Sequence, residues 1–306
     1  MARSKLCSMR EAIARLVPDG ASVCLGTALE AAIPFAAGHE IIRQGRRDLT
    51  LIGPISDMLF DQMIGAGTVG RVVAAWVGNV SAGLGHNYRR AAERGEPRRI
   101  EVEEHSNFTI ALGLAAGALG APYIPTRSLL GTDLADANPA FRRGTDPWSG
   151  TPLLLVPAIR PDVTIVHVQR ADEQGNCHAW GPLGVTREAA MAARAVIVTA
   201  EELVPTARIL ADPNLVLVLA TKVAAVVHEP WGAHPAPLQG YYGRDHEAYA
   251  RYHEESRRAD GFRAWLDRWV LGVPDRRSYL ERVGGETLAR LAVRRHLPSD
   301  PVDYGV

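Results

Sequence analysis

Short apolar runs alternate with amphipathic stretches along the first hundred residues of the chain. The apolar runs cover residues 21–25, 48–52, 72–77 and 100–103, and each is followed by small or polar residues. Between them, apolar residues recur at helical spacing over residues 8–16, 33–44, 56–64 and about 87–94. Strands that alternate with helices in this way are typical of βαβ units, in which a parallel sheet is covered on both faces.

Local signals mark the ends of two of these helices. Ser8 stands at the start of the first helix and Glu11 lies three residues after Ser8, which is the spacing of a capping box. Gly45 follows the second helix and suits the left-handed backbone position that commonly ends a helix.

The alternation returns in the second half of the chain. Apolar runs predict strands at residues 163–168, 195–199, 215–219 and 223–228. A short helix is expected at residues 186–194, and Glu201 and Glu202 indicate the start of another. Residues 133–156, between the two halves, contain many turn signals and predict a long loop. Such a loop either covers a site or is a surface excursion.

The last part of the chain is helical and charged. Trp265 and Trp269 lie four residues apart, so they face the same side of a helix and are expected to be packing residues. We expect one α/β domain over residues 1–306. It has an open, mostly parallel sheet with helices on both faces, and a helical C-terminal extension from about residue 244 packs on it.

One stretch, residues 100–133, concentrates the candidate chemistry. A short strand ends in Glu104-His105-Ser106-Asn107, and an almost entirely apolar helix follows over residues 108–119. In open α/β folds, ligands bind where the carboxyl ends of strands meet the positive end of a helix dipole. The alternative is that Ser106 or Asn107 only caps the helix while Glu104 and His105 are solvated.

Composition and charge exclude several classes of protein. The chain has 34 basic and 34 acidic residues, and this balance argues against nucleic acid or an anionic membrane as the main partner. Its three cysteines form no CxxC pair, so neither a disulfide framework nor a structural zinc site is indicated. The glycine-rich stretches lack the spacing of nucleotide-binding loops. Without a signal-peptide pattern or an apolar run of about 20 residues, a cytoplasmic protein is expected.

Several segments, in a fixed order, resemble the α (A) subunit of family I coenzyme A transferases, particularly the glutaconate CoA-transferase group. They include EEHSNFTIALGLAAGALGAPYIPTRSLLGTD (103–133), HVQRADEQGNCHAWG (167–181) and VVHEPWGAHPAP (226–237). The others cover residues 33–59, 74–85 and 199–204. The resemblance implies the open α/β fold shared with sugar-phosphate isomerase-like proteins, and a homologous β subunit, often in an α2β2 assembly. It implies coenzyme A as a substrate and no permanently bound cofactor.

In such transferases a glutamate attacks the acyl-CoA thioester, and CoA passes through a glutamyl-CoA thioester to an acceptor carboxylate. That glutamate belongs to the β subunit, within a Ser-Glu-Asn-Gly-like motif, and this chain has no such motif. The resemblance therefore implies an α subunit that shapes the acyl pocket but does not transfer CoA alone. Two alternatives are a subunit of a CoA-thioester-dependent ring-opening hydrolase and a non-catalytic scaffold. In the hydrolase branch the catalytic acid falls nearer Asn107, which is not ionisable.

The candidate site residues follow from this resemblance and from their places at strand ends. Glu104 is expected in a supporting catalytic role, and Arg127 pairs with a substrate carboxylate or with an internal acid. His105 either bridges to a substrate carboxylate or is a hydrogen-bonded structural histidine. The full set of expected substrate-binding residues is Gly26, Thr27, Asn79, Ser81, His105, Ser106, Asn107, Arg127 and Gly131. No metal site is expected, because Pro230 and Gly232 deny His228, Glu229 and His234 helical spacing.

Overall fold

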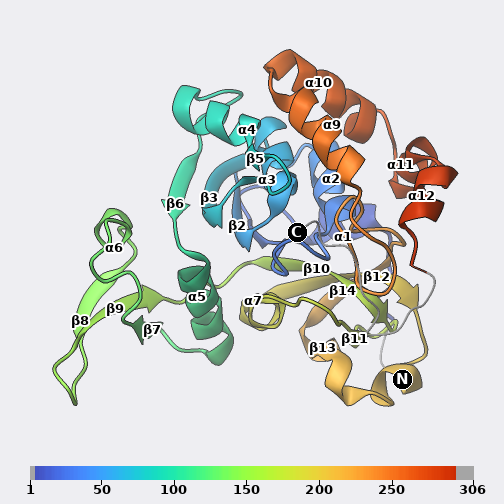
Figure 1. Ribbon diagram of the computed structural model, residues 1–306. Coiled ribbons are helices and arrows are strands. Elements are labelled where there is room, and N and C mark those ends of the chain that lie inside the picture. The colour runs from blue at the N-terminus through green and yellow to red at the C-terminus, as the bar shows by residue number, and fades with distance from the viewer. Residues whose placement is uncertain (1–3, 294–306) are drawn as a thin grey trace.

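A parallel sheet forms the centre of the molecule, in a computed structural model that describes residues 4–293 (Figure 1). Within these residues seven parallel strands lie in the order β6-β3-β2-β1-β10-β12-β14. Two short antiparallel strands, β11 and β13, extend the sheet beside the carboxyl end of β10. The strands are β1 (Ser22–Cys24), β2 (Leu49–Ile55), β3 (Val69–Trp76), β6 (Glu101–Glu104), β10 (Val163–Ala171), β11 (Cys177–His178), β12 (Ala195–Leu203), β13 (Val216–Val218) and β14 (Val223–His228).

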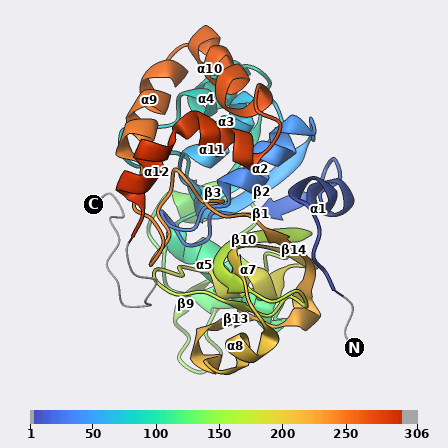
Figure 2. The ribbon, with the colours of Figure 1, turned by 90° about the vertical axis from the view of Figure 1, so that its right-hand side faces the viewer.

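Helices cover both faces of this sheet, as the sequence predicts (Figure 2). Side chains alternate between faces along a strand, so Leu51 packs among α1, α2 and α3 while its neighbour Ile52 packs under α5 and α7. The helices are α1 (Met9–Leu16), α2 (Phe35–Arg43), α3 (Asp57–Gly65), α5 (Asn107–Leu119) and α7 (Thr186–Ala192). The Ser8–Glu11 capping box is formed, and Gly45 has a φ of +63° just beyond α2.

The C-terminal helices pack on the α1–α3 side of the sheet. They are α9 (His246–Ser256), α10 (Ala259–Leu266), α11 (Arg276–Val283) and α12 (Gly285–Leu291). Trp265 and Tyr252 meet edge to face, with ring centroids 4.8 Å apart, inside the same apolar core as the sheet. Trp269 packs against this core, which confirms the packing role predicted for both tryptophans. None of the helices in residues 4–293 is long and apolar enough to cross a membrane.

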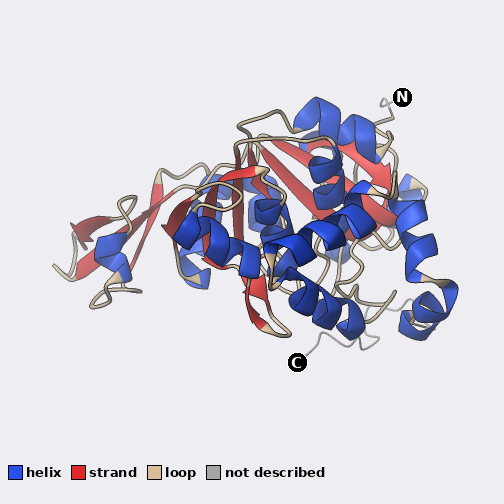
Figure 3. Ribbon diagram, turned by 90° about the horizontal axis from the view of Figure 1, so that it is seen from above, coloured by secondary structure: helices blue, strands red, loops and turns tan. Residues whose placement is uncertain are grey.

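Residues 133–156 do not form the predicted loop. They supply a short helix, α6 (Leu134–Ala137), and two strands, β8 (Arg142–Thr145) and β9 (Pro152–Pro157). With β7 (Tyr123–Thr126) these strands form a small antiparallel sheet, which we call the arm, and it projects from the body of the molecule (Figures 1 and 3). Phe141 and Leu154 are buried in the arm against Leu112 of α5, so tertiary packing overrides the local turn signals.

Two strands are longer than their sequence patterns indicate. β2 continues through Gly53 and Pro54, and β12 includes Glu201 and Glu202, where a helix start was predicted. That prediction was wrong because both glutamates have partners on β10, the neighbouring strand. Glu202 pairs with Arg170 at 3.1 Å, and Glu201 contacts His167 at 2.7 Å. The remaining short elements are the β4–β5 hairpin (Gly78–Asn79 and Gly83–Leu84), α4 (His86–Arg89) and α8 (Thr206–Leu210). Short π-helical segments continue α4 (η1, Arg90–Arg94) and α10 (η4, Asp267–Leu271), and 3-10 turns lie at η2 (Pro213–Leu215) and η3 (Ala220–Lys222).

Candidate functional site

The carboxyl ends of β1, β2, β3 and β6 lie at one edge of the sheet, and most predicted site residues follow these strands. Gly53 of β2 is paired with Ala74 of β3, and Ala74 with Glu104 of β6. Gly26 and Thr27 follow β1, Asn79 and Ser81 follow β3, and the Glu104–Asn107 turn ends β6. A crevice at this edge is the usual ligand-binding place in an open parallel sheet.

The turn after β6 is fixed by a reciprocal cap at the start of α5. The Ser106 hydroxyl accepts a hydrogen bond from the Thr109 backbone N–H at 3.1 Å, and the Thr109 hydroxyl accepts one from the Ser106 N–H at 2.9 Å. Of the two capping candidates, Ser106 is thus the cap, and Asn107 is the first helical residue. The apolar α5 can begin at the sheet edge because two of its orphan donors are satisfied this way.

His105 points inward and is buried, so the solvated alternative was wrong for this residue. Its Nε2 lies 2.7 Å from Glu103 Oε1, and its Nδ1 lies 3.2 Å from the Thr109 hydroxyl. Glu103 also forms an ion pair with Arg71. The hydrogen bond from His105 is the largest of the effects that hold the pKa of Glu103 below its usual value. Both ring nitrogens of His105 therefore have partners within the chain, and its contact with substrate stays a prediction.

Glu104 faces outward, together with Asn107 and Phe108 at the amino end of α5. Its backbone carbonyl accepts a hydrogen bond from Asn138 Nδ2 at 2.7 Å, which attaches the arm to this turn. The carboxylate thus lies exposed near a helix N-terminus, where the helix dipole favours negative charge. It is available to a substrate or to a second chain.

The turns after β1 and β3 present backbone groups rather than side chains. Thr27 is buried and its hydroxyl contacts that of Thr186 at 2.9 Å. Asn79 is buried as well. Its Nδ2 donates to the Tyr249 carbonyl at 2.9 Å, and its Oδ1 accepts from the Ser81 N–H at 3.0 Å. Any contact of Thr27 with a ligand would therefore use the backbone of its turn. In the turn after β3, the Val80 and Ser81 N–H groups already donate to Asp57 and Asn79.

Arg127 and Gly131 lie in the arm, between β7 and α6, and both are exposed. Within residues 4–293 neither makes a hydrogen bond or ion pair with the residues at the strand ends. The internal acid considered as a partner for Arg127 is also not found in this part of the chain. The structure therefore brings seven of the nine predicted binding residues to one edge, and places these two on a neighbouring element.

Sequence reasoning missed a buried charge network at the same edge. The Arg244 guanidinium lies 3.0 Å from Glu30 Oε2 and 3.2 Å from Asp57 Oδ2. Asp57 Oδ1 accepts a hydrogen bond from the Val80 N–H at 3.0 Å. Burial raises the pKa of Asp57, and the positive charge of Arg244 opposes this shift. No local signal marks this network, because 187 residues separate Arg244 from Asp57.

A second buried cluster was also missed. Glu201 accepts hydrogen bonds from the Tyr242 hydroxyl at 2.6 Å and from the Trp231 N–H at 2.8 Å, in addition to its contact with His167. Nearby, Glu229 lines a groove of about 680 Å³ with Arg43 and Arg276, and burial raises its pKa to about 7. In the described residues no three His, Cys, Asp or Glu side chains gather in a metal-binding arrangement.

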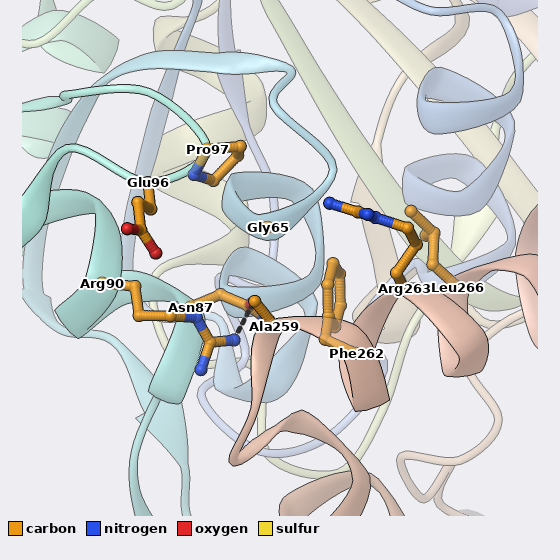
Figure 4. A pocket seen from close by; sticks show the side chains of 9 residues that line it. All are labelled: Gly65, Asn87, Arg90, Glu96, Pro97, Ala259, Phe262, Arg263 and Leu266. Atoms are coloured by element: carbon orange, nitrogen blue, oxygen red, sulfur yellow. Dashed lines mark hydrogen bonds between the residues drawn. The ribbon is translucent and has the colours of Figure 1, made fainter.

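A further cavity, of about 220 Å³, lies between the carboxyl end of α3 and α10 (Figure 4). Gly65 of α3 lines it, and β3 starts four residues later, so this cavity lies toward the amino end of β3. Arg90 donates to Asn87 Oδ1 at 2.5 Å, and Asn87 Nδ2 donates to Asp61 at 3.1 Å, so these lining groups bond to the protein itself. The candidate site is therefore the opposite edge, where the strands end.

Known proteins resemble this chain in both sequence and architecture. The family model described as "Coenzyme A transferase" matches residues 7–228. The chain is 40% identical over 272 residues to the A subunit of 3-oxoadipate CoA-transferase from Pseudomonas knackmussii, covering 89% of this chain and 95% of that protein. The crystal structure of glutaconate coenzyme A-transferase from Acidaminococcus fermentans superimposes with a TM-score of 0.89 at 30% identity, covering 95% of this chain and 96% of that one. The IpdA subunit of the cholesterol ring-cleaving hydrolase of Rhodococcus jostii is 27% identical over 293 residues, covering 89% of this chain and 94% of that one. The chain therefore belongs to the coenzyme A transferase family.

Proposed function

We propose that this chain is the α-type subunit of a heteromeric CoA-transferase, which moves CoA between an acyl-CoA and a carboxylic acid. One observation carries the proposal: the turns after β1, β3 and β6 meet at one sheet edge and leave Glu104 exposed beside the start of α5. The chain has no Ser-Glu-Asn-Gly-like motif to supply the nucleophile. This edge is therefore half of an active site, and the other half comes from a homologous β-type chain.

The proposed reaction divides one difficult exchange into easier steps. The partner's glutamate attacks the thioester carbonyl carbon, the C–S bond breaks, and an acyl-glutamyl anhydride forms as the CoA thiolate leaves. The thiolate then attacks the glutamyl carbonyl, which releases the first carboxylate and leaves a glutamyl-CoA thioester. The acceptor carboxylate then attacks the glutamyl-CoA thioester, and the same two steps in reverse transfer CoA to the acceptor and free the glutamate. Backbone N–H groups of the turn after β1 stabilise the oxyanions that develop, and Glu104 supports substrate positioning.

Exposed apolar side chains at the start of α5 and in the arm support a partner chain. Phe108 at the start of α5 is 52% exposed and Trp148 in the arm is 91% exposed. The arm touches the Glu104 turn through Asn138, so a chain seated against the arm would also reach the site. Large exposed aromatic residues are enriched at protein interfaces. We propose an α2β2 assembly, as the family resemblance implies.

The test is an exchange assay with this chain alone, with a homologous β-type chain alone, and with both together. Glutaconate and 3-oxoadipate, the acids in the relatives' names, are the first acceptors to try. We expect exchange only from the mixture. No exchange from the mixture, together with hydrolytic opening of the ring of a cyclic acyl-CoA whose thioester stays intact, would contradict the transferase and favour the hydrolase.

Replacing Glu104 by Gln in the mixture tests the role of this chain's carboxylate. Glu101→Gln is the matched control, because Glu101 is another exposed carboxylate on β6. A supporting role predicts that Glu104→Gln slows exchange by about tenfold, well short of the loss of a nucleophile, while Glu101→Gln leaves the rate unchanged. Complete loss of activity in Glu104→Gln would contradict the supporting role.

A further inference from the structure

A buried arginine from the C-terminal part of the chain joins the turns at the candidate site. The Arg244 side chain, just before α9, is fully buried, and its guanidinium lies over the Tyr249 ring at 4.5 Å. One nitrogen of the guanidinium meets Glu30, in the turn after β1, and another meets Asp57, directly after β2. The planar fork of arginine presents a separate nitrogen to each carboxylate, whereas a lysine would offer both carboxylates one nitrogen on a flexible stem.

The same network reaches the third turn. Asp57 accepts the Val80 N–H, and Val80 lies between Asn79 and Ser81 in the turn after β3. The Tyr249 backbone carbonyl, beside the ring that Arg244 covers, accepts from Asn79. The turns after β1, β2 and β3 are thus held relative to one another through a single guanidinium and the helix that follows it.

These turns contain strained backbone that needs such support. Leu29, Ala32 and Asp57 have φ values of +66°, +52° and +51°, in the left-handed region that residues other than glycine rarely adopt. Such conformations persist only where the surrounding structure imposes them, and they cluster at functional sites. Two of the three lie in the turn that Glu30 anchors, and the third is the Asp57 that Arg244 contacts.

We propose that Arg244 is a positioning residue for the transfer reaction. It acts through Glu30 and Asp57, and it does not touch substrate, because it is buried beneath the turns. Its role is to hold the turn after β1 against the turns after β2 and β3, so that the backbone N–H groups of the turn after β1 stay aligned on the oxyanion that develops in the transition state. This inference rests on the proposed function, which places the reaction at this edge.

The test uses Arg244→Lys in the assembled enzyme, since lysine keeps the charge but lacks the rigid fork that presents one nitrogen to each carboxylate. We expect amide hydrogen exchange at Val80 and in residues 27–34 to become faster by about tenfold, as local opening becomes easier. We expect kcat to fall by about tenfold or more, since small misplacements of catalytic groups carry such losses, while KM changes by less than about twofold. Glu30→Gln removes one of the two ion pairs of Arg244, at a partly exposed residue. It should speed amide hydrogen exchange and lower kcat as Arg244→Lys does, but by less.

Arg276→Lys is the matched control. Arg276 is also buried, but it donates to the backbone carbonyls of Trp231 and His234 and makes no ion pair with Glu30 or Asp57. The Arg276→Lys substitution should lower Tm without changing amide hydrogen exchange at Val80 or kcat. Unchanged Val80 exchange in Arg244→Lys, or an equal fall of kcat in Arg276→Lys, would overturn the inference. A wild-type complex without transferase activity would overturn the proposed function. Amide hydrogen exchange at Val80 in Arg244→Lys would still decide whether Arg244 holds the turns in place.

Discussion

Gly26, at the end of β1, should tolerate no side chain, and replacing it by alanine tests how tightly the strand ends are joined. Its φ is +70°, a conformation that costs an L-residue roughly 1–2 kcal/mol. A Cβ would also overlap the Ser56 hydroxyl and lie 2.7 Å from the Ser56 Cα. The Ser56 hydroxyl donates to the Leu25 carbonyl at 2.6 Å, so neither group can move freely. Such overpacking adds about 1–3 kcal/mol, which gives a total of roughly 2–5 kcal/mol.

Gly45→Ala is the matched control for this prediction. Gly45 has a similar φ of +63°, but a Cβ there would meet nothing within 4 Å. The Gly45→Ala variant should lose only the backbone contribution to the free energy of unfolding, about 1–2 kcal/mol. Urea unfolding of the two variants and the wild type, under the same conditions, measures the difference in the free energy of unfolding. If Gly26→Ala loses no more than Gly45→Ala, the close contact between the ends of β1 and β2 does not exist as described.

Three further predictions concern the turn after β6 and the arm. Ser106→Ala removes the cap of α5 and should lower the free energy of unfolding by about 1 kcal/mol, measured by urea unfolding; no loss would mean that the cap is not formed. Glu103→Gln removes a carboxylate whose pKa is held below its usual value of 4.5 by His105 and Arg71. A lowered folded-state pKa stabilises the fold above that usual value, and this contribution is lost as the pH falls through the folded-state pKa. The variant should therefore be less stable than wild type at pH 7, with a deficit that disappears in acid, and a deficit that grows in acid would contradict the assignment. Trp148→Asp should leave the stability of this chain within about 0.5 kcal/mol of wild type, because the side chain is largely exposed. It should weaken binding to the β-type chain by about tenfold or more, measured by titration calorimetry, and unchanged affinity would exclude the arm from the interface.

Local pattern was sufficient for the elements that carry their own signals. The strand at 100–103, a cap at Ser106 or Asn107 and the apolar helix at 108–119 are all encoded within about twenty residues. The structure has the strand and the helix within one residue of these bounds, with Ser106 as the cap. The alternation of Leu51 and Ile52 between two cores shows why the parallel sheet could be recognised from short apolar runs.

What failed depends on contacts between distant residues. Glu201 resembles a helix start in sequence, and its distant partners His167, Tyr242 and Trp231 make it acceptable inside a strand. Residues 133–156 carry turn signals, but their few apolar side chains find a core against α5. Arg244 lies in a charged helical region, and nothing near it in sequence indicates that Glu30 and Asp57 are its partners. A buried charge such as that of Arg244 can be predicted only when the opposite charge that pairs with it in the fold is known.

The central claim is that this chain supplies half of an active site whose nucleophile belongs to another chain. Incubating the assembled complex with acyl-CoA, reducing it with borohydride and mapping the modified glutamate by mass spectrometry tests this claim directly. The expected result is reduction of one glutamate on the β-type chain, with every glutamate of the 306-residue chain unmodified. A reduced glutamate on this chain, at Glu104 or elsewhere, would contradict it.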